Sequence, residues 1–274
     1  MRLSEKVIES SGFITSRYNK KIRFGLVTGT GLGDLSKNIN VHIEIPFASI
    51  PNFPESSVPF HEARLLLGDI NGINIIVMNG RYHYYEGHSM PEITLPIRVF
   101  HQLGVKTILL TNAASSIREK IKPGSLAVIA DHLNLMGNNP LIGSHEPILG
   151  ERFTDMSEPY NNHLIDQARV IANQNKLPLK KIVFAAISGP SLLAAAEIKM
   201  LQYFGADAMG MSVVPEVLVA RQLGMNVFAV SAITDQLLPG KMSKIEPGNV
   251  TNEAKKVIPG LSLLVSTLIE KIQV

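Results

Sequence analysis

Residues 91–114, PEITLPIRVFHQLGVKTILLTNAA, decide the fold class of this chain of 274 residues. A helical pattern begins at Pro91 and ends before Gly104, with proline early and glycine just after the end, as is typical of helices. An apolar run follows at 107–111, and the small polar segment 112–114 comes directly after it. A helix, a buried strand and a loop of small residues in this order predict one unit of an α/β sheet.

The same alternation recurs along the chain, which predicts a mostly parallel or mixed central sheet covered by helices on both faces, a three-layer α/β/α fold. No linker or charge block divides the sequence, so we expect one domain over residues 1–274. The expected strands are 24–28, 73–78, 107–111, 126–130, 182–187, 206–209 and 227–234, and the expected helices are 91–103, 192–204, 215–223 and 253–272, the last with a break at Pro259-Gly260.

The bulk composition excludes several kinds of protein. There is no cysteine, which excludes disulfides, thiolate nucleophiles and zinc–thiolate sites. The formal net charge is +3 and the 26 basic residues are scattered, which argues against a nucleic-acid surface. Nothing resembles a signal peptide or an apolar stretch of about 20 residues. We therefore expect a cytoplasmic protein that binds neither nucleic acid nor a membrane.

Six segments with polar residues each follow an apolar run. Ligands of α/β sheets bind beyond the carboxyl ends of the strands, so these segments predict one pocket for a small molecule, built from the whole chain. The segments are GTGLG at 29–33, RYHYYE at 81–86, TNAA at 111–114, SGPS at 188–191, MGMS at 209–212 and TDQ at 234–236.

Two of these segments suggest an anion site. Arg81 and His83 directly follow a buried strand, and Glu86 can orient the His83 imidazole, so the group suits a bound phosphate better than a surface salt bridge. Thr30 lies in a glycine-rich turn that can bring backbone N–H groups to an anion, although a plain tight turn has the same glycines. Asp34 replaces the third glycine of the dinucleotide fingerprint, and no P-loop is present.

The remaining candidates are ambiguous from the residues alone. Asp235 ends a very apolar strand, where a lone carboxylate suggests recognition or proton transfer. Ser212 and the small residues from Asn112 can serve a ligand or close helix–strand packing. Met209 and Met211 suit either the core or a wall for a flat heterocycle.

Taken in order, these segments resemble the trimeric purine nucleoside phosphorylases and their methylthioadenosine phosphorylase relatives. The resemblance covers 24 to about 253, and its most specific parts are 80–87, 95–114, 131–134 and 205–224. It implies a nucleoside phosphorylase-like α/β fold and phosphorolysis, in which phosphate attacks C1′ of a purine nucleoside and releases the base and a pentose 1-phosphate. Phosphate would be a cosubstrate, and neither a metal nor an organic cofactor is expected.

The resemblance also implies roles for individual residues. His83, Glu86 and Asp235 would be catalytic. The phosphate would contact Thr30, His61, Arg81, His83, the Ala113 backbone and Ser212. The nucleoside would contact Tyr85, Asn112, Phe153, Leu192, Leu193, Met209, Met211, Asp235 and Asn252. Phe153 would enter the site of a neighbouring subunit, so we expect a homotrimer.

The chain departs from the family mainly where the base would bind. Members that act on 6-oxopurines usually carry Phe-Glu and Asn where this chain has Leu192-Leu193 and Asp235. Leu193 cannot accept the purine N1–H, whereas Asp235 can accept from a 6-amino group or, when protonated, donate to N7. Base preference therefore stays open, and an adenosine- or methylthioadenosine-preferring phosphorylase is an alternative.

Two further departures concern the sugar and the rate. Ser115-Ser116 replaces the usual Gly-Gly, which narrows the approach of the backbone to the base. Asn252 stands where the family has a His on the 5′-hydroxyl, and its polar side chain favours a 5′-hydroxyl over a methylthio group. A nucleoside-binding protein with weakened catalysis is the other alternative.

Overall fold

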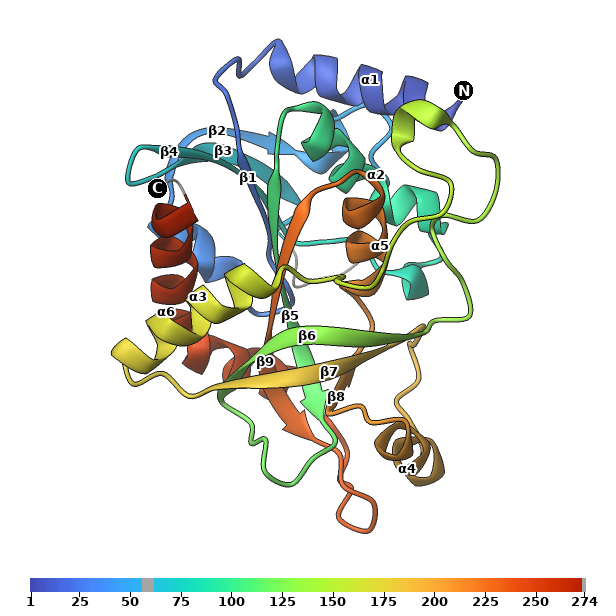
Figure 1. Cartoon of the computed structure of the whole chain (residues 1–274), viewed down its shortest axis with the longest axis vertical. Coiled ribbons are helices and arrows are strands. Elements are labelled where there is room, and N and C mark those ends of the chain that lie inside the picture. Colours follow the sequence, from blue (N-terminus) through green and yellow to red (C-terminus); the bar gives the residue numbers. More distant parts are fainter. Residues whose placement is uncertain (56–61, 273–274) are drawn as a thin grey trace.

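In the computed structural model, which describes residues 1–55 and 62–272, a mixed β-sheet runs through the molecule with helices on both sides (Figure 1). The sheet order is β2-β3-β4-β1-β5-β8-β7-β6-β9, which confirms the predicted α/β class with a mixed sheet. The strands are β1 (Phe24–Val27), β2 (Asn40–Pro46), β3 (Arg64–Ile70), β4 (Ile73–Asn79), β5 (Thr107–Ser116), β6 (Ser125–Leu135), β7 (Leu179–Ile187), β8 (Ala208–Gly210) and β9 (Asn226–Gln236).

The sheet closes on itself over part of its width, because β5 pairs with β9 as well as with β8. The two strands run parallel from the pair Thr107 and Asn226 to the pair Ser116 and Gln236, with a register shift after Ala114. Their carboxyl ends therefore lie side by side, which brings two of the predicted polar segments, 111–114 and 234–236, to one place.

Helices cover the sheet in two groups. On one side α1 (Leu3–Thr15) packs on α2 (Met90–Gln102), and α2 packs on α5 (Val214–Gln222). On the other side α3 (Asn162–Gln174) packs on α6 (Pro247–Ile272), and α6 also packs on β9. The short α4 (Ala195–Tyr203) projects from the lower right in Figure 1. In the part of the chain that is described, no helix is both long and apolar enough to cross a membrane.

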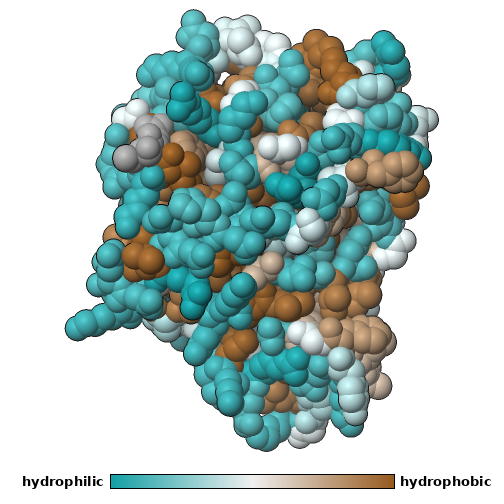
Figure 2. Space-filling model, viewed as in Figure 1, coloured by the Kyte–Doolittle hydropathy of each residue, from teal (hydrophilic) through white to brown (hydrophobic). Residues whose placement is uncertain are grey.

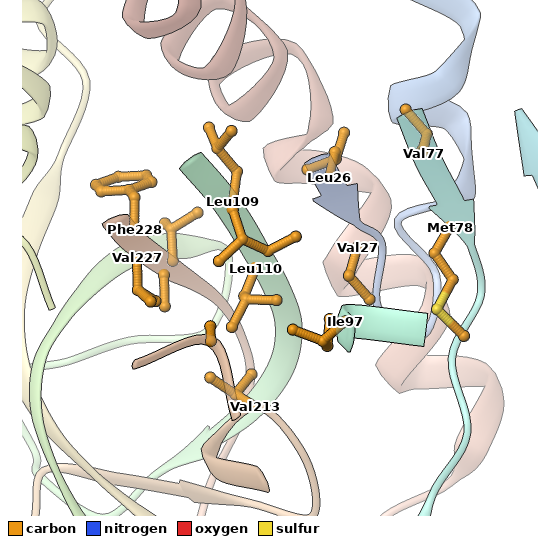
Figure 3. Packing of buried hydrophobic residues seen from close by; sticks show 14 of the residues in the cluster. Leu26, Val27, Val77, Met78, Ile97, Leu109, Leu110, Val213, Val227 and Phe228 are labelled. Carbon is orange, nitrogen blue, oxygen red and sulfur yellow. The ribbon is translucent and has the colours of Figure 1, made fainter. Parts of the chain in front are cut away.

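A continuous apolar core holds the strands that end at the site. Figure 3 shows side chains of β1, β4, β5 and β9 in one cluster, with Ile97 of α2 pointing toward the sheet. All four residues of β1 are buried, so this strand reads as a short apolar run without alternation. Close packing on both faces holds this strand in place, and with it the position of the loop that follows.

Several element predictions need correction. The edge strand β2 and its neighbour β3 were not expected, although β2 alternates apolar and polar residues and β3 contains a run of buried leucines. Helix α3 was not expected either. The predicted break at Pro259-Gly260 is wrong, because α6 starts at Pro247 and continues through both residues. Gly260 lets α6 lie close to Leu177, and this packing outweighs the backbone bond that Pro259 cannot make.

Candidate active site

A cavity of about 210 Å³ lies at the carboxyl ends of β1, β4, β5, β8 and β9. These strand ends contribute most of its wall, and segments before α4 and at the start of α6 complete it. The structure thus brings most of the predicted site residues together. Those that line the cavity are Thr30, Arg81, His83, Tyr85, Asn112, Ala113, Leu192, Met209, Met211, Ser212 and Asp235.

Arg81 supplies a buried positive charge at one end of the cavity, with only 2% of its surface exposed. Its Nη2 donates to the carbonyl oxygen of Thr111 at 2.5 Å, which ties it to the end of β5. Its Nη1 lies 3.3 Å from a carboxylate oxygen of Glu216 on α5. Burial lowers the pKa of Arg81, and the Glu216 charge opposes this shift. The guanidinium is therefore held from two sides before any anion arrives.

His83 is oriented by Glu86, as the sequence predicts. Glu86 Oε1 accepts from the His83 backbone N–H at 2.7 Å and lies 3.2 Å from Nδ1 of its ring. The Tyr85 ring stacks on the imidazole with centroids 4.7 Å apart. Burial lowers the pKa of His83, and the hydrogen bond to Glu86 opposes this shift. Burial also raises the pKa of Tyr85 to about 12, so its hydroxyl keeps its proton.

Ser212 also lines the cavity and is followed by a strained turn. Val213 has φ +74° and ψ −55°, and the Val214 N–H donates to the Ser212 carbonyl oxygen at 2.9 Å. A three-residue turn with positive φ is rare and costly, most of all for a β-branched residue. Strain of this kind persists where the surrounding structure holds it, and here it joins Ser212 directly to α5.

Part of the cavity wall is apolar. Met209 and Met211 line it, and Met211 lies against Gly189 of the predicted SGPS segment. Gly189 has φ +66°, and a Cβ at this position would overlap the Met211 sulfur. A flexible thioether wall of this kind suits a flat ring or the face of a sugar.

Asp235 is the titratable group at the far end of β9. The Thr234 hydroxyl donates to its Oδ2 at 2.7 Å. Burial raises the pKa of Asp235, the Thr234 hydrogen bond opposes this shift, and the nearby Glu253 charge adds to it. The carboxyl group therefore keeps a proton to higher pH than an ordinary Asp, which fits an acid that can donate to a ligand.

Four of the predicted residues that the structure describes do not line the cavity. Glu86 lies behind His83, and Leu193 packs into a second apolar cluster beneath α4. Phe153 is 89% exposed and borders a separate cavity with Leu141 and Leu218. Asn252 is exposed, while His61 lies outside the described residues.

The position of Asn252 follows from helix geometry. Val250 lines the cavity, and Ala254, one turn later, packs where a Cβ of Gly31 would lie. Residues four apart share a helix face, so a residue midway between them points away. The polar contact predicted for Asn252 is thus replaced at the wall by the apolar Val250.

Sequence reasoning missed several neighbours of the site. The lining residues that it did not name as contacts are Gly29, Ala114, Ser115, Gly210, Thr234, Ile245 and Val250. Glu216 was missed because VVPEVLV reads as a buried helix, and Ser231 because VFAVSAI reads as a buried strand. A charged or hydroxyl side chain inside such an apolar run is the signal that points to a buried partner.

Comparisons with known proteins agree with this geometry. The Phosphorylase superfamily matches residues 23–270. Purine nucleoside phosphorylase 1 of Geobacillus stearothermophilus is 44% identical over 227 residues, which is 83% of each chain. Isoform 2 of the Schistosoma mansoni purine nucleoside phosphorylase, solved with cytosine and ribose-1-phosphate, has a TM-score of 0.92 at 36% identity and covers 97% of this chain and 95% of its own.

A second Schistosoma mansoni purine nucleoside phosphorylase, solved with adenosine, also has a TM-score of 0.92, at 32% identity over 97% of each chain. The resemblance inferred from the sequence motifs is therefore confirmed over nearly the whole chain. This chain belongs to the phosphorylase superfamily and, within it, to the family of purine nucleoside phosphorylases.

Proposed function

We propose that this protein cleaves the N-glycosidic bond of purine ribo- or deoxyribonucleosides with inorganic phosphate, without a metal or an organic cofactor. The observation that carries this proposal is the polarity of the cavity. Thr30, Arg81, His83 and Ser212 supply hydrogen-bond donors to its wall, and Met209, Met211 and Asp235 also line it. Arg81 is bonded to the Thr111 carbonyl oxygen, whereas Asp235 lies beside Ser115, farther along β5. An anion and a purine ring can therefore be held on opposite sides of a sugar.

The cavity supports the reaction in three ways. The donors hold a phosphate oxygen next to C1′, which replaces a bimolecular encounter by a positioned one. As the C1′–N9 bond breaks, the phosphate charge stabilises the positive charge that develops on the sugar. The bonding electron pair goes to the purine, and protonated Asp235 can donate to N7 to ease this departure. The products are the free base and a pentose 1-phosphate.

A 6-aminopurine substrate is the second candidate that an observation favours. Asp235 lines the cavity, whereas Leu193 is not among the residues that line it and packs in the apolar cluster of α4. A carboxylate can accept from the adenine amino group, and the wall at Val250 adds apolar surface near the start of α6. Methylthioadenosine is a member of this substrate class, and Val250 suits its apolar 5′ substituent better than Asn252 would.

Phosphate dependence tests the proposed reaction directly. We expect purified protein to release base from inosine, guanosine, adenosine or methylthioadenosine only when phosphate is present, and to yield the pentose 1-phosphate. Release of base at an equal rate without phosphate, with free pentose as product, would identify a hydrolase. Binding without turnover of all four nucleosides would identify a nucleoside-binding protein instead.

A homotrimer in which subunits share the site is part of the proposal. The loop between β6 and α3 exposes the large apolar side chains of Ile142, Ile148 and Phe153. Apolar side chains are also exposed over α4, close to Leu192 at the cavity, and Figure 2 shows this apolar patch on a mostly hydrophilic face. Two such surfaces on one chain suit contact between neighbouring copies.

Subunit mixing tests whether Phe153 serves a neighbour. We expect sedimentation to give a trimer, and Phe153→Ala to lower kcat/KM because the shared site loses an aromatic wall. Coexpression of Phe153→Ala with an Arg81→Met/Glu216→Leu chain, which binds phosphate weakly but has Phe153 intact, should restore part of the activity at low phosphate. A fully active monomer, or hybrids no more active than the two parents, would contradict a shared site.

A further inference from the structure

Asn112 and Ser231 form a buried pair inside the sheet, beside the cavity. They are register partners of β5 and β9, and their exposed fractions are 2% and 0%. Ser231 Oγ lies 2.8 Å from Asn112 Oδ1. In this contact the hydroxyl donates and the amide oxygen accepts, so Oδ1 of Asn112 faces Ser231.

The other amide atom, Asn112 Nδ2, faces away from Ser231. It is buried and has no hydrogen-bond partner within residues 1–55 and 62–272, although Asn112 lines the cavity. It lies beside Gly210, where an added Cβ would be 3.4 Å from it. A buried donor without a partner lowers stability, so a donor kept at a cavity wall points to an acceptor on a ligand.

The reverse orientation of the amide is less favourable. With the amide turned over, Nδ2 would donate to Ser231 Oγ, and the Ser231 hydroxyl hydrogen would lose its acceptor. Among the described residues, Asn112 is the hydrogen-bond partner of the Ser231 side chain. The hydroxyl thus selects the orientation in which the N–H groups of Asn112, a residue of the cavity wall, face away from Ser231.

We propose that Ser231 is a positioning residue that makes Asn112 a hydrogen-bond donor to an oxygen of the bound phosphate or of the sugar next to it. This inference rests on the proposed phosphorolysis. Asn112 follows Thr111, whose carbonyl oxygen binds Arg81, and its Cα packs against Gly29, so it lies toward the anion end. Asp235 lies beyond it along the paired strands, toward the expected base.

A double-mutant cycle tests whether Ser231 acts through Asn112. We expect Asn112→Ala to lower kcat/KM by about tenfold or more and Ser231→Ala by about threefold to tenfold, since the freed amide still presents its donor part of the time. The double variant should be no slower than Asn112→Ala. Multiplied losses in the double variant would show that Ser231 acts independently and would overturn the proposal.

Kinetic measurements with varied phosphate and with deoxy nucleosides identify the acceptor oxygen. If it belongs to phosphate, Ser231→Ala and Asn112→Ala raise the KM of phosphate and leave that of the nucleoside unchanged. If it belongs to the sugar, both losses disappear with either the 2′-deoxy or the 3′-deoxy nucleoside. Equal losses with every nucleoside and an unchanged KM of phosphate would also overturn the proposal.

Two controls show whether a loss of activity is specific to Asn112 and Ser231 or reflects general loss of structure. Ser10→Ala removes a buried hydroxyl of α1 that contacts the Lys6 and Pro51 carbonyl oxygens outside the cavity, and it should change neither kinetic constant. Far-ultraviolet circular dichroism and unfolding midpoints show whether each variant folds. The wild-type chain reports separately on the proposed function, because its failure to use phosphate would be evident before any variant is made.

Discussion

Arg81→Ala is expected to weaken phosphate binding by at least about tenfold, because each lost hydrogen bond to a charged group costs roughly 1.5–3 kcal/mol. The same change should lower the free energy of unfolding by about 3–5 kcal/mol, since it leaves Glu216 buried without its partner. Phosphate titrations of initial rate, together with urea unfolding followed by circular dichroism, measure the two effects. Nucleoside affinity without phosphate should barely change.

A variant with both residues replaced separates the loss of phosphate affinity from the loss of stability. Arg81→Met with Glu216→Leu replaces the buried ion pair by apolar side chains of similar size, which is often neutral for stability. We expect this chain to unfold near the wild-type midpoint and to remain as weak for phosphate as Arg81→Ala. An unchanged KM of phosphate in the paired variant would remove Arg81 from the phosphate site.

The fold was predictable where burial dominates the local sequence. The strand at 107–111 is apolar throughout, and the structure extends it to Ser116 as β5. The edge strand β2 was not predictable in this way, because it is largely exposed and carries His42 and Glu44. The continuity of α6 depends on contacts with distant residues, which local helix-stop signals do not contain.

The same distinction applies to the residues of the site. Thr30, Arg81 and Asp235 were predictable because each lies at or just after the carboxyl end of a strand, and the parallel strands end at one edge. Glu216 and Ser231 act through partners more than 100 positions away in the chain, and no local pattern encodes such a pair. Their role depends on how the strands pack against one another and against α5, and this packing exists only in the folded core.

Asp235→Asn is expected to shift the ratio of kcat/KM for inosine over adenosine toward inosine by roughly 1–3 kcal/mol, about fivefold to 150-fold. An amide can donate to O6 of a 6-oxopurine while it accepts from a protonated N7, whereas a carboxylate accepts from the 6-amino group of adenine. Steady-state kinetics with both nucleosides at saturating phosphate give the ratio. The matched control is Thr234→Val, which keeps the carboxyl group and removes the hydroxyl that donates to it.

The pH profile distinguishes a chemical role of Asp235 from a change of shape. Burial raises the pKa of this carboxyl, so the protonated acid persists to higher pH than for a free Asp, and activity that depends on it falls as the pH rises through that pKa. The asparagine variant does not titrate and should lose this limb. Thr234→Val removes a bond that lowers the pKa, so its limb should move to higher pH. If wild type strongly prefers inosine, and Asp235→Asn changes neither the substrate ratio nor the profile, Asp235 does not contact the 6-position or N7 of the base.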